Sequence, residues 1–303
     1  MRRFSSISTT QLARICGVSQ GTVDRALHDR GGISQKTKEK ILAVAREYEY
    51  VPHTAVGNSK QSMLIGVVLF DLYNEFFSKL AMSLVNAARA DGYSVVFLFS
   101  NKSLKEEKSA IDYFNYIGVD GIVLFSVGSD SEDYENYLKS LSRPLVTVGN
   151  RLFDFDFIGI DDYSAMYDLT EKVLSVTGGG ELQYFAPILK KEIHGKNAQR
   201  KRAEGFVAAM NKHGAKYSFA YSEKEISQDV SGIISSTDHY AMNVLKAVGN
   251  SGIAVAGFDN VSALKNIGRE VFTVDYSTDE IAKECMNYFL RRKYNSKIKY
   301  SVL

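Results

Sequence analysis

The sequence predicts an α/β protein with a small helical head and a larger core built on two parallel sheets. In residues 9–48, apolar residues recur at the three- and four-residue spacing of helices. From Leu64 onward, short runs rich in β-branched and aromatic residues alternate with helical segments. Such alternation is typical of βαβ units, whose parallel strands are buried on both faces. At 303 residues, the chain is long enough for two or three compact units.

Three helices are predicted in the head. Ser8 followed by Gln11 fits a capping box, which would start the first helix near Thr9. Ser19 and Ser34 can cap the second and third helices through their hydroxyls. The expected helices span residues 9–16, 20–27 and 35–48, and the expected inward-facing residues are Leu12, Ala13, Ile15, Val23, Ala26, Leu27, Ile41, Leu42 and Ala45.

The second predicted helix carries polar residues on its outward face: Gln20, Gly21, Asp24, Arg25 and His28. A short second helix with polar residues at its N-terminal end is the geometry that enters a major groove. The first sixty residues contain ten Lys/Arg and five Asp/Glu, a formal charge of +5, while the remainder carries −3. A solvated basic face would carry the same charge, but concentration on the head suits phosphate binding, and the sequence predicts duplex DNA as the partner.

The core begins after a polar, glycine-containing stretch, residues 53–62, which is typical of a linker. Two series of predicted strands follow. Two sequential α/β sheets imply two lobes, and open α/β sheets place ligands in the crevice at the ends of their strands. The first series is LIGVVLF, YSVVFLF, VDGIVLF and PLVTVGN, and the second is ELQYFAP, SFAY, SGIISS, IAVAGF and VFTV.

Composition argues against several classes of protein. No apolar run approaches the roughly 18 residues of a membrane span, and the opening MRRFSSIS lacks the apolar stretch of a secretion signal. Cys16 and Cys285 are expected to be reduced structural thiols of a cytoplasmic protein. The five histidines are scattered, and we find no motif of a serine hydrolase, zinc protease or P-loop enzyme. We therefore expect no metal, no cofactor and no enzymatic activity.

Short blocks along most of the chain carry a family resemblance. The head contains LARICGVSQGTVDRAL, ISQKTKEKIL and YVP, and the core contains LIGVV, VDGIVLF, VGNR, IGIDDYSAM, RKRAEGFVAAM and VAGFDN. These blocks resemble the lac repressor/galactose repressor (LacI-type) family of bacterial regulators. The resemblance implies a core like the periplasmic sugar-binding proteins, with chain crossings between lobes near Asp161, Tyr276 and Arg291. The implied domains are a head of residues 1–52, a hinge of 53–62, an N-terminal lobe of 63–160 with 277–290, and a C-terminal lobe of 161–276 with 291–303.

The resemblance and base chemistry together select residues expected at DNA. Gln20 is the candidate for base reading, because a carboxamide can pair with adenine in the major groove. Thr22 would pack or touch a phosphate, and Arg25 would pair with guanine or a phosphate. Asp24 departs from the family's usual serine; it could accept from cytosine or, as we favour, pair with Arg25 or Arg30. The expected set is Ser8, Thr10, Ser19, Gln20, Gly21, Thr22, Arg25, His28, Thr37, Tyr50 and His53.

The resemblance also assigns effector-binding positions of the family to individual residues of this chain. Arg202 matches an arginine that many members use to grip the effector; the rival interpretation is a surface ion pair with Glu204. Asp71 would accept sugar hydroxyls or cap a helix, and Phe76 would stack on a ring or pack in the core. Asp259 ends a strand where the family places a ligand-binding carboxylate. The expected set is Asp71, Phe76, Asn150, Arg151, Arg202, Thr237, Asp259 and Tyr276.

Two stretches depart from the family pattern. Only nine residues separate the strand candidates 218–221 and 231–236, fewer than a helical crossover needs. We therefore expect a trimmed second lobe with a more open cleft on that side. In the hinge, Gly57 disfavours a helix and Ser59 offers no apolar wedge. The operator is accordingly expected to bend less than is usual in the family.

The leading hypothesis is a homodimeric, cytoplasmic transcription regulator, a repressor by family default. It would read a pseudo-palindromic operator and respond to a small effector, a sugar or related metabolite, bound between the lobes. The alternative is a DNA-binding regulator whose core no longer binds a small molecule and responds to a protein partner or only dimerises. The trimmed lobe favours this alternative.

Overall fold

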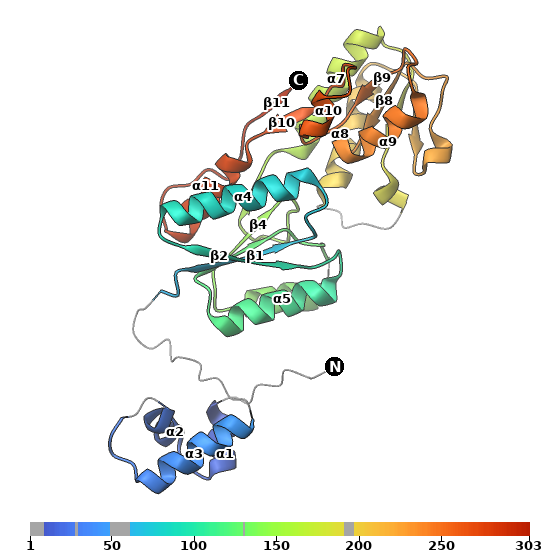
Figure 1. The fold of residues 1–303 in the computed structure, drawn as a ribbon. Helices are drawn as coiled ribbons and strands as arrows, with labels where there is room; N and C mark the ends of the chain where they lie inside the picture. Colours follow the sequence, from blue (N-terminus) through green and yellow to red (C-terminus); the bar gives the residue numbers. More distant parts are fainter. Residues whose placement is uncertain (1–8, 28–29, 49–60, 130, 191–196) are drawn as a thin grey trace. The chain divides into compact units, whose positions relative to one another are not determined.

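The computed structural model divides the chain into two compact units, residues 1–61 and 62–303 (Figure 1). We describe each unit by itself. The described residues are 9–27, 30–48, 61–129, 131–190 and 197–303.

The first unit contains the three expected helices, α1 (Thr9–Cys16), α2 (Gln20–Leu27) and α3 (Gln35–Glu47). Ser19 and Ser34 cap the second and third as predicted, because their hydroxyls accept the amide protons of Thr22 (3.2 Å) and Thr37 (3.1 Å). The residues that form the small core are Leu12, Ala13, Cys16, Val23, Ala26, Ile41 and Ala45.

One predicted inner residue of the head is wrong. Ile15 is 43% exposed, and Cys16 takes its place in the core. At 100° per residue, Leu12, Ala13 and Cys16 share one face of α1, and Ile15 lies about 100° from the middle of that face. The free thiol of Cys16 is buried, as expected of a structural cysteine.

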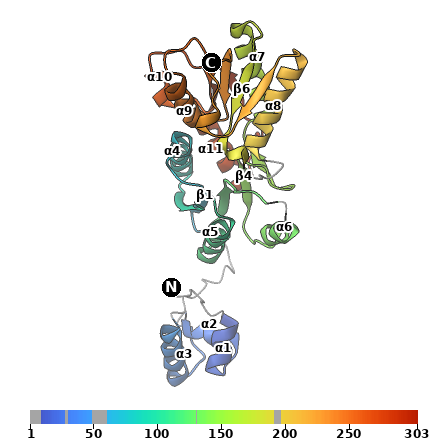
Figure 2. The same ribbon diagram turned by 90° about the vertical axis from the view of Figure 1, so that its right-hand side faces the viewer.

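The N-terminal lobe is a five-stranded parallel sheet in the order β2-β1-β3-β4-β5. Helices α4 and α11 cover one face, and α5 and α6 cover the other (Figures 1 and 2). The two-residue strand β5 was not predicted, because two residues are too short to show a pattern. The bounds are β1 (Leu64–Leu69), α4 (Glu75–Ala90), β2 (Ser94–Phe99), α5 (Leu104–Ile117), β3 (Gly121–Leu124), α6 (Glu132–Lys139), β4 (Leu145–Val148), β5 (Phe157–Ile158) and α11 (Thr278–Phe289).

The C-terminal lobe is a four-stranded parallel sheet in the order β7-β6-β8-β9. Helices α7 and α8 pack on one face, and α9 and α10 pack on the other. The bounds are α7 (Asp162–Thr177), β6 (Leu182–Phe185), η1 (Pro187–Lys190), α8 (Ala198–Lys212), β7 (Tyr217–Ala220), η2 (Glu223–Glu225), β8 (Gly232–Ser235), α9 (Asp238–Val248), β9 (Ala254–Ala256) and α10 (Ser262–Lys265).

The last predicted strand of the second series does not extend the parallel sheet. Phe272 makes an isolated bridge to Ala256, and the chain then forms β10 (Val274–Tyr276). This strand pairs antiparallel with β11 (Tyr300–Val302). The segment between them contains α11, which packs against α4 of the other lobe, so the chain leaves the C-terminal lobe after β10 and returns before β11. The domain boundaries given above remain a prediction.

The short crossover between β7 and β8 is confirmed. Residues 221–231 contain only the 3-10 turn η2. In place of a helix, the buried Gln183 side chain of β6 holds this connection. Its Oε1 accepts from the Ser227 amide (2.9 Å) and its Nε2 donates to the Glu225 carbonyl (3.1 Å).

Of the helices in the described residues, none combines the length and apolar character that a membrane crossing needs.

Candidate functional site

The head presents its predicted DNA-reading residues on the surface. Thr10, Ser19, Gln20, Gly21 and Arg25 are exposed, and Thr22 and Thr37 are half-buried. Ser8, His28, Tyr50, His53 and the hinge residues Val56–Ser59 lie outside the described residues.

Helix α1 helps to orient the principal candidate for base reading. The Gln20 Nε2 atom donates to the Thr10 hydroxyl at 2.6 Å, so the two residues lie side by side on α2 and α1. Arg30 pairs with Asp24 at 3.1 Å, which confirms the ion pair that we favoured for this aspartate. That pair leaves Gln20 and Arg25 as the polar residues that α2 presents, and DNA contact by them stays a prediction.

A cavity of about 360 Å³ opens where the strands of the two core sheets end. Its walls include the loops after β1 to β5, β8 and β9, the first turns of α4, α7, α8 and α9, and residues of η1, β10 and α11. The expected effector residues that line it are Asp71, Phe76, Asn150, Arg202, Thr237, Asp259 and Tyr276.

Arg151 is the exception among the expected effector residues. Its guanidinium leaves the cavity and stacks 4.0 Å from the centroid of the Phe157 ring. The preceding residue, Asn150, turns inward and is buried. Arg151 is therefore not part of the cavity that the structure describes.

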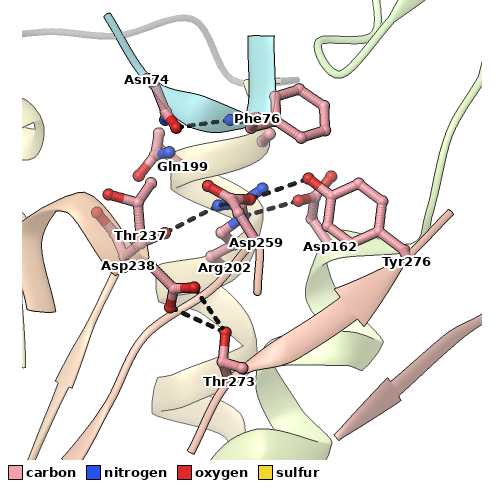
Figure 3. A network of polar contacts seen from close by, with 12 residues as sticks. Asn74, Phe76, Asp162, Gln199, Arg202, Thr237, Asp238, Asp259, Thr273 and Tyr276 are labelled. Atoms are coloured by element: carbon pink, nitrogen blue, oxygen red, sulfur yellow. Dashed lines mark hydrogen bonds and ion pairs between the residues drawn. The ribbon is translucent and has the colours of Figure 1, made fainter. Parts of the chain in front are cut away.

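Arg202 is the centre of the polar side of the cavity (Figure 3). Its Nε donates to Asp162 at 2.8 Å, and its Nη1 donates to the Ser236 carbonyl at 2.8 Å. Asp259 Oδ1 lies 3.6 Å from Nη1, and the guanidinium stacks 3.6 Å from the centroid of the Phe258 ring. The rival interpretation of Arg202, a surface ion pair with Glu204 or a neighbour, is wrong, because Arg202 is buried and Glu204 pairs instead with Lys201.

Close packing of two helices brings Arg202 to Asp162. Gly205, one turn further along α8, lies against the backbone of α7: a Cβ placed there would come within 2.2 Å of the Tyr163 carbonyl oxygen. Only glycine allows this approach. Asp161 caps α7 by accepting from the Ser164 amide at 3.1 Å, and this leaves Asp162 to face Arg202.

Burial changes the acid chemistry of this network. It raises the pKa of Asp259 to about 7, an effect that Asp238 and Asp162 strengthen and that Arg202 and Tyr276 oppose. Burial and the neighbouring Asp259 carboxylate also raise the pKa of Tyr276, whose hydroxyl donates to Asp259 at 2.9 Å. Asp259 adopts a φ of 106°, in the region that side chains rarely occupy. Burial therefore favours the protonated form of Asp259 more than it would for an exposed aspartate.

A second buried carboxylate, Asp238, holds the backbone next to Asp259. Asp238 accepts from the Val261 amide at 2.8 Å and from the Thr273 hydroxyl at 2.8 and 3.0 Å. These bonds join the start of α9 to the loops around Asp259. Burial raises the pKa of Asp238 to about 6, even though its hydrogen bonds oppose the shift.

The opposite wall, from the N-terminal lobe, is aromatic. Phe125 contacts Phe77 edge-on with ring centroids 4.8 Å apart, and Phe70 packs 4.9 Å from Phe125. Phe76 lies 5.5 Å from Tyr276 of the other lobe. Phe76 is only 7% exposed, so it belongs to the core and also borders the cavity. We call the rings Phe70, Phe76, Phe77 and Phe125 the aromatic wall.

Two polar residues predicted to bind the effector, Asn150 and Thr237, also make hydrogen bonds that stabilise the fold. Asn150 donates to the Ser126 carbonyl at 2.7 Å and accepts from the Ala198 amide at 3.0 Å, which joins the two lobes. Thr237 caps α9 by accepting from the Tyr240 amide at 3.3 Å.

Asp71 does not cap a helix, so that alternative is wrong. Asn74 is the cap of α4, since its Oδ1 accepts from the Phe76 amide at 3.0 Å. Asp71 accepts instead from the Tyr73 amide at 3.0 Å, and Lys102 Nζ lies 3.8 Å from its other oxygen.

Sequence reasoning missed a contact across the cleft mouth. Both oxygens of Glu75 on α4 accept the first amide of α10, from Ser262, at 2.9 and 3.0 Å. Lys79 pairs with Glu75 at 2.8 Å and donates to the Asn260 carbonyl at 3.1 Å. Partial burial opposes the shift, but the bonds from Lys79 and Ser262 lower the pKa of Glu75 to about 2. Glu75 therefore links the lobes directly.

The cavity has further lining residues that the sequence did not single out. Asp162 had a usable signal, because a doubled aspartate at a helix start supplies one cap and one free carboxylate. The others offered none. They include Tyr73, Asn74, Lys102, Gln199 and His239.

Comparison with known proteins gives a consistent result. The model of bacterial regulatory proteins of the lacI family matches residues 10–53, and the model of periplasmic binding proteins and the sugar binding domain of the LacI family matches residues 62–228. The chain is 28% identical over 172 residues to the HTH-type transcriptional regulator DegA of Bacillus subtilis (strain 168), a match that covers 54% of this chain and 51% of the relative. It is 25% identical over 304 residues to the sucrose operon repressor of Pediococcus pentosaceus, covering 93% and 90%.

Solved structures share the fold. A transcriptional regulator CelR–cellobiose complex superposes with a TM-score of 0.66 at 18% identity, covering 98% of each chain. The lac repressor dimer bound to operator and the anti-inducer ONPF gives 0.67 at 17% identity, covering 99% and 98%. The Cra transcriptional dual regulator from Pseudomonas putida in complex with fructose 1-phosphate gives 0.64 at 17% identity, covering 80% and 98%.

Proposed function

The chain belongs to the lacI family of bacterial regulatory proteins, and from this membership we propose that it is an operator-binding transcriptional repressor controlled by a small sugar-like effector. The head reads duplex DNA through α2, chiefly through Gln20 and Arg25. The core binds the effector in the cavity between its lobes. Two heads on a homodimer read the two halves of a pseudo-palindromic operator.

The observation that carries this proposal is the cavity. Seven residues selected from the sequence for effector contact gather on it from both lobes. A ligand held between two lobes favours the closed arrangement over the open one, and lobe movement can then alter the spacing of the heads. The sucrose operon repressor and the CelR–cellobiose complex support a sugar as the effector.

The regulator needs no catalytic step, cofactor or metal in this account. The carboxylates and guanidinium of the cavity pair with one another, which suits binding and not turnover. Because its target is chromosomal DNA, we assign the protein to the cytoplasm.

An operator assay tests the DNA half of the proposal. A binding site selected from a random duplex pool should bind the full chain about 10³-fold or more tightly than scrambled duplex. Gln20→Ala should reduce this preference, whereas Lys36→Ala, at an exposed position of α3, should retain it. Equal affinity for selected and scrambled duplex would contradict sequence-specific binding.

The same operator complex tests effector control. A panel of neutral and phosphorylated sugars should contain a compound that changes operator affinity by about tenfold or more, the usual size of allosteric coupling. If the operator binds tightly and no compound changes its affinity, the second candidate holds. That candidate is a regulator whose core responds to a protein partner or only dimerises, and the direct lobe contacts of Glu75 and Asn150 favour it.

A further inference from the structure

The charges around the cavity define the chemical class of the effector, and this inference rests on the proposed function. The formally charged residues among the described lining are Asp71, Asp162, Asp259, Lys102 and Arg202. Three carboxyl groups thus face two cationic side chains, and burial favours the protonated form of one of the three, Asp259. A phosphate ester carries a charge of about −1.5 to −2 at neutral pH and requires unpaired positive charge or free amides.

The positive charge of Arg202 already has a buried partner. Asp162 compensates it at 2.8 Å, Asp259 lies 3.6 Å away, and the Ser236 carbonyl accepts another of its protons. The Arg202 and Asp259 side chains are only 7% and 5% exposed, so water screens the attraction weakly. A phosphate would have to displace carboxylates that the fold already holds in place.

Lys102 is a weak anion site. Its side chain is 64% exposed, and its Nζ lies 3.8 Å from Asp71. An exposed ammonium beside a carboxylate contributes little attraction in water.

Helix N-termini, the other common anion sites of proteins, are partly satisfied by the chain itself. Four helices begin at the cavity, and the chain's own side chains accept first-turn amides of each. Asn74 accepts from Phe76 on α4 (3.0 Å), Asp161 from Ser164 on α7 (3.1 Å), Asn197 from Gln199 on α8 (2.9 Å) and Thr237 from Tyr240 on α9 (3.3 Å). On α8, Asn150 also accepts from Ala198 at 3.0 Å.

The cavity instead offers acceptors. The Gln199 Oε1 atom is buried and has no partner among the described residues. Gln199 lines the cavity, as does Asn74 of the opposite lobe, and both are labelled in Figure 3. A buried acceptor requires a donor. A hydroxyl group donates a proton to such an acceptor, whereas a phosphate dianion has none to donate.

We propose that the effector is an uncharged polyhydroxylated compound, that Gln199 accepts from one of its hydroxyls, and that phosphorylated sugars are rejected. The aromatic wall covers the apolar face of the bound ring, and the carboxylates receive its hydroxyls. A neutral sugar meets both requirements, and its phosphate ester brings negative charge to a site with no free cation among the described residues.

Matched pairs of probes test this inference on the full chain. Fructose with fructose 1-phosphate, glucose with glucose 6-phosphate, and sucrose with sucrose 6-phosphate are titrated by calorimetry at constant ionic strength, and each is added to the operator complex. The neutral member of a pair should bind about 100-fold more tightly than its phosphate ester, because like charges juxtaposed in a closed site are strongly disfavoured. Gln199→Leu should weaken that binding about tenfold, while Glu204→Gln, on the exposed side of α8, should not.

Inorganic phosphate is a second probe that requires no knowledge of the effector. Asp162→Asn removes a charge that compensates Arg202, so phosphate should stabilise this variant against heat and leave the wild type unchanged. Asp168→Asn, an equal charge change at an exposed position of α7, should behave as the wild type does.

The outcomes separate the two levels of the proposal. A phosphate ester that binds more tightly than its parent sugar, or phosphate that stabilises the wild type as much as Asp162→Asn, overturns the inference and leaves effector control intact. If neither member of any pair binds and operator affinity never changes, effector control fails, and the inference fails with it.

Discussion

The two walls of the cavity between the lobes are built on different principles. The N-terminal lobe contributes the aromatic wall, whose rings pack edge to face. The C-terminal lobe contributes an ionic network in which Asp162, Arg202 and Asp259 are all nearly buried. Rings hold their positions through packing that is indifferent to pH, whereas the ionic wall depends on charge balance. The comparison teaches that the aromatic wall fixes the shape of the cavity, whereas the charge of the ionic wall changes with pH.

Removing the central cation should produce the largest effect. Arg202→Met leaves Asp162 and Asp259 buried without a counter-charge, and breaking a buried pair in this way costs about 3–5 kcal/mol. Urea unfolding of the full chain measures the loss. The neighbouring Lys201→Met, which removes only an exposed pair with Glu204, should cost less than about 1 kcal/mol. Equal losses would contradict the ionic description of this wall.

The second-largest effect should be the pH dependence of the free energy of unfolding. Burial raises the folded-state pKa of Asp259 to about 7, above the unfolded value of about 4. The protonated acid therefore stabilises the fold below about pH 4, and this contribution is lost as the pH rises towards 7. Relative to Asp259→Asn, the wild type should lose on the order of 1 kcal/mol of unfolding free energy per pH unit across this range. Unfolding at pH 5, 6, 7 and 8 measures the difference, and a constant difference would exclude the shifted pKa.

The aromatic wall should respond less strongly and without pH dependence. Phe125→Leu keeps an apolar side chain but removes the edge-on contacts with Phe70 and Phe77, at a cost of about 1–2 kcal/mol. The loss should be the same at pH 5 and pH 8. Tyr113→Leu, an exposed ring on α5, is the control and should fall within about 0.5 kcal/mol of the wild type. If the stability lost in Phe125→Leu depends on pH, the aromatic wall does not differ from the ionic wall in the way described.

The smallest effect should appear where the walls meet. Glu75→Gln removes the charge that Ser262 and Lys79 contact across the cleft mouth, worth about 0.5–1 kcal/mol near a helix N-terminus. The pKa of Glu75 is lowered to about 2, so its contribution is present above about pH 4.5 and is lost as the pH falls towards 2.

Small-angle scattering can detect the expected opening of the lobes as a larger radius of gyration in Glu75→Gln. Glu135→Gln on α6 removes a similar pair with Lys139 at the same four-residue spacing, but it joins no lobes and should leave the radius unchanged. If both variants keep the wild-type radius, Glu75 does not hold the cleft closed.

The sequence predicted the parts of the fold that repeat a pattern. Strong apolar runs predicted the four long strands of the first sheet and the four of the second, because such runs are buried on both faces. The two-residue β5 and the antiparallel pairing of β10 with β11 carry no periodic signal and depend on tertiary contacts. In the head, Ile15 was misplaced because one α-helical turn of sequence does not define the centre of a buried face.

The cavity was predicted in part for a similar reason. Residues at strand ends, such as Asp259 and Asn150, converge wherever parallel strands end together. Arg151 does not line the cavity, because adjacent side chains diverge and its neighbour Asn150 already points inward; its contact with an effector stays a prediction. Gln199 and Glu75 lie on the first turns of helices, and only the arrangement of the lobes brings them to the cavity and the cleft mouth. Long-range placement of this kind is absent from a single sequence.

The hydrogen bonds by which Gln183 holds the short β7–β8 connection have a consequence for chimeras made from related cores. Its carboxamide is buried and matched to the backbone of residues 225–227, about forty positions further along the chain. A longer crossover helix transplanted into this protein would remove both backbone partners of that amide and leave it only a 3.4 Å contact with the Ser218 hydroxyl, at a cost of about 1–3 kcal/mol. The short connection and Gln183 therefore depend on each other. A chimera that exchanges only the connection or only the glutamine should fold less stably than both parents.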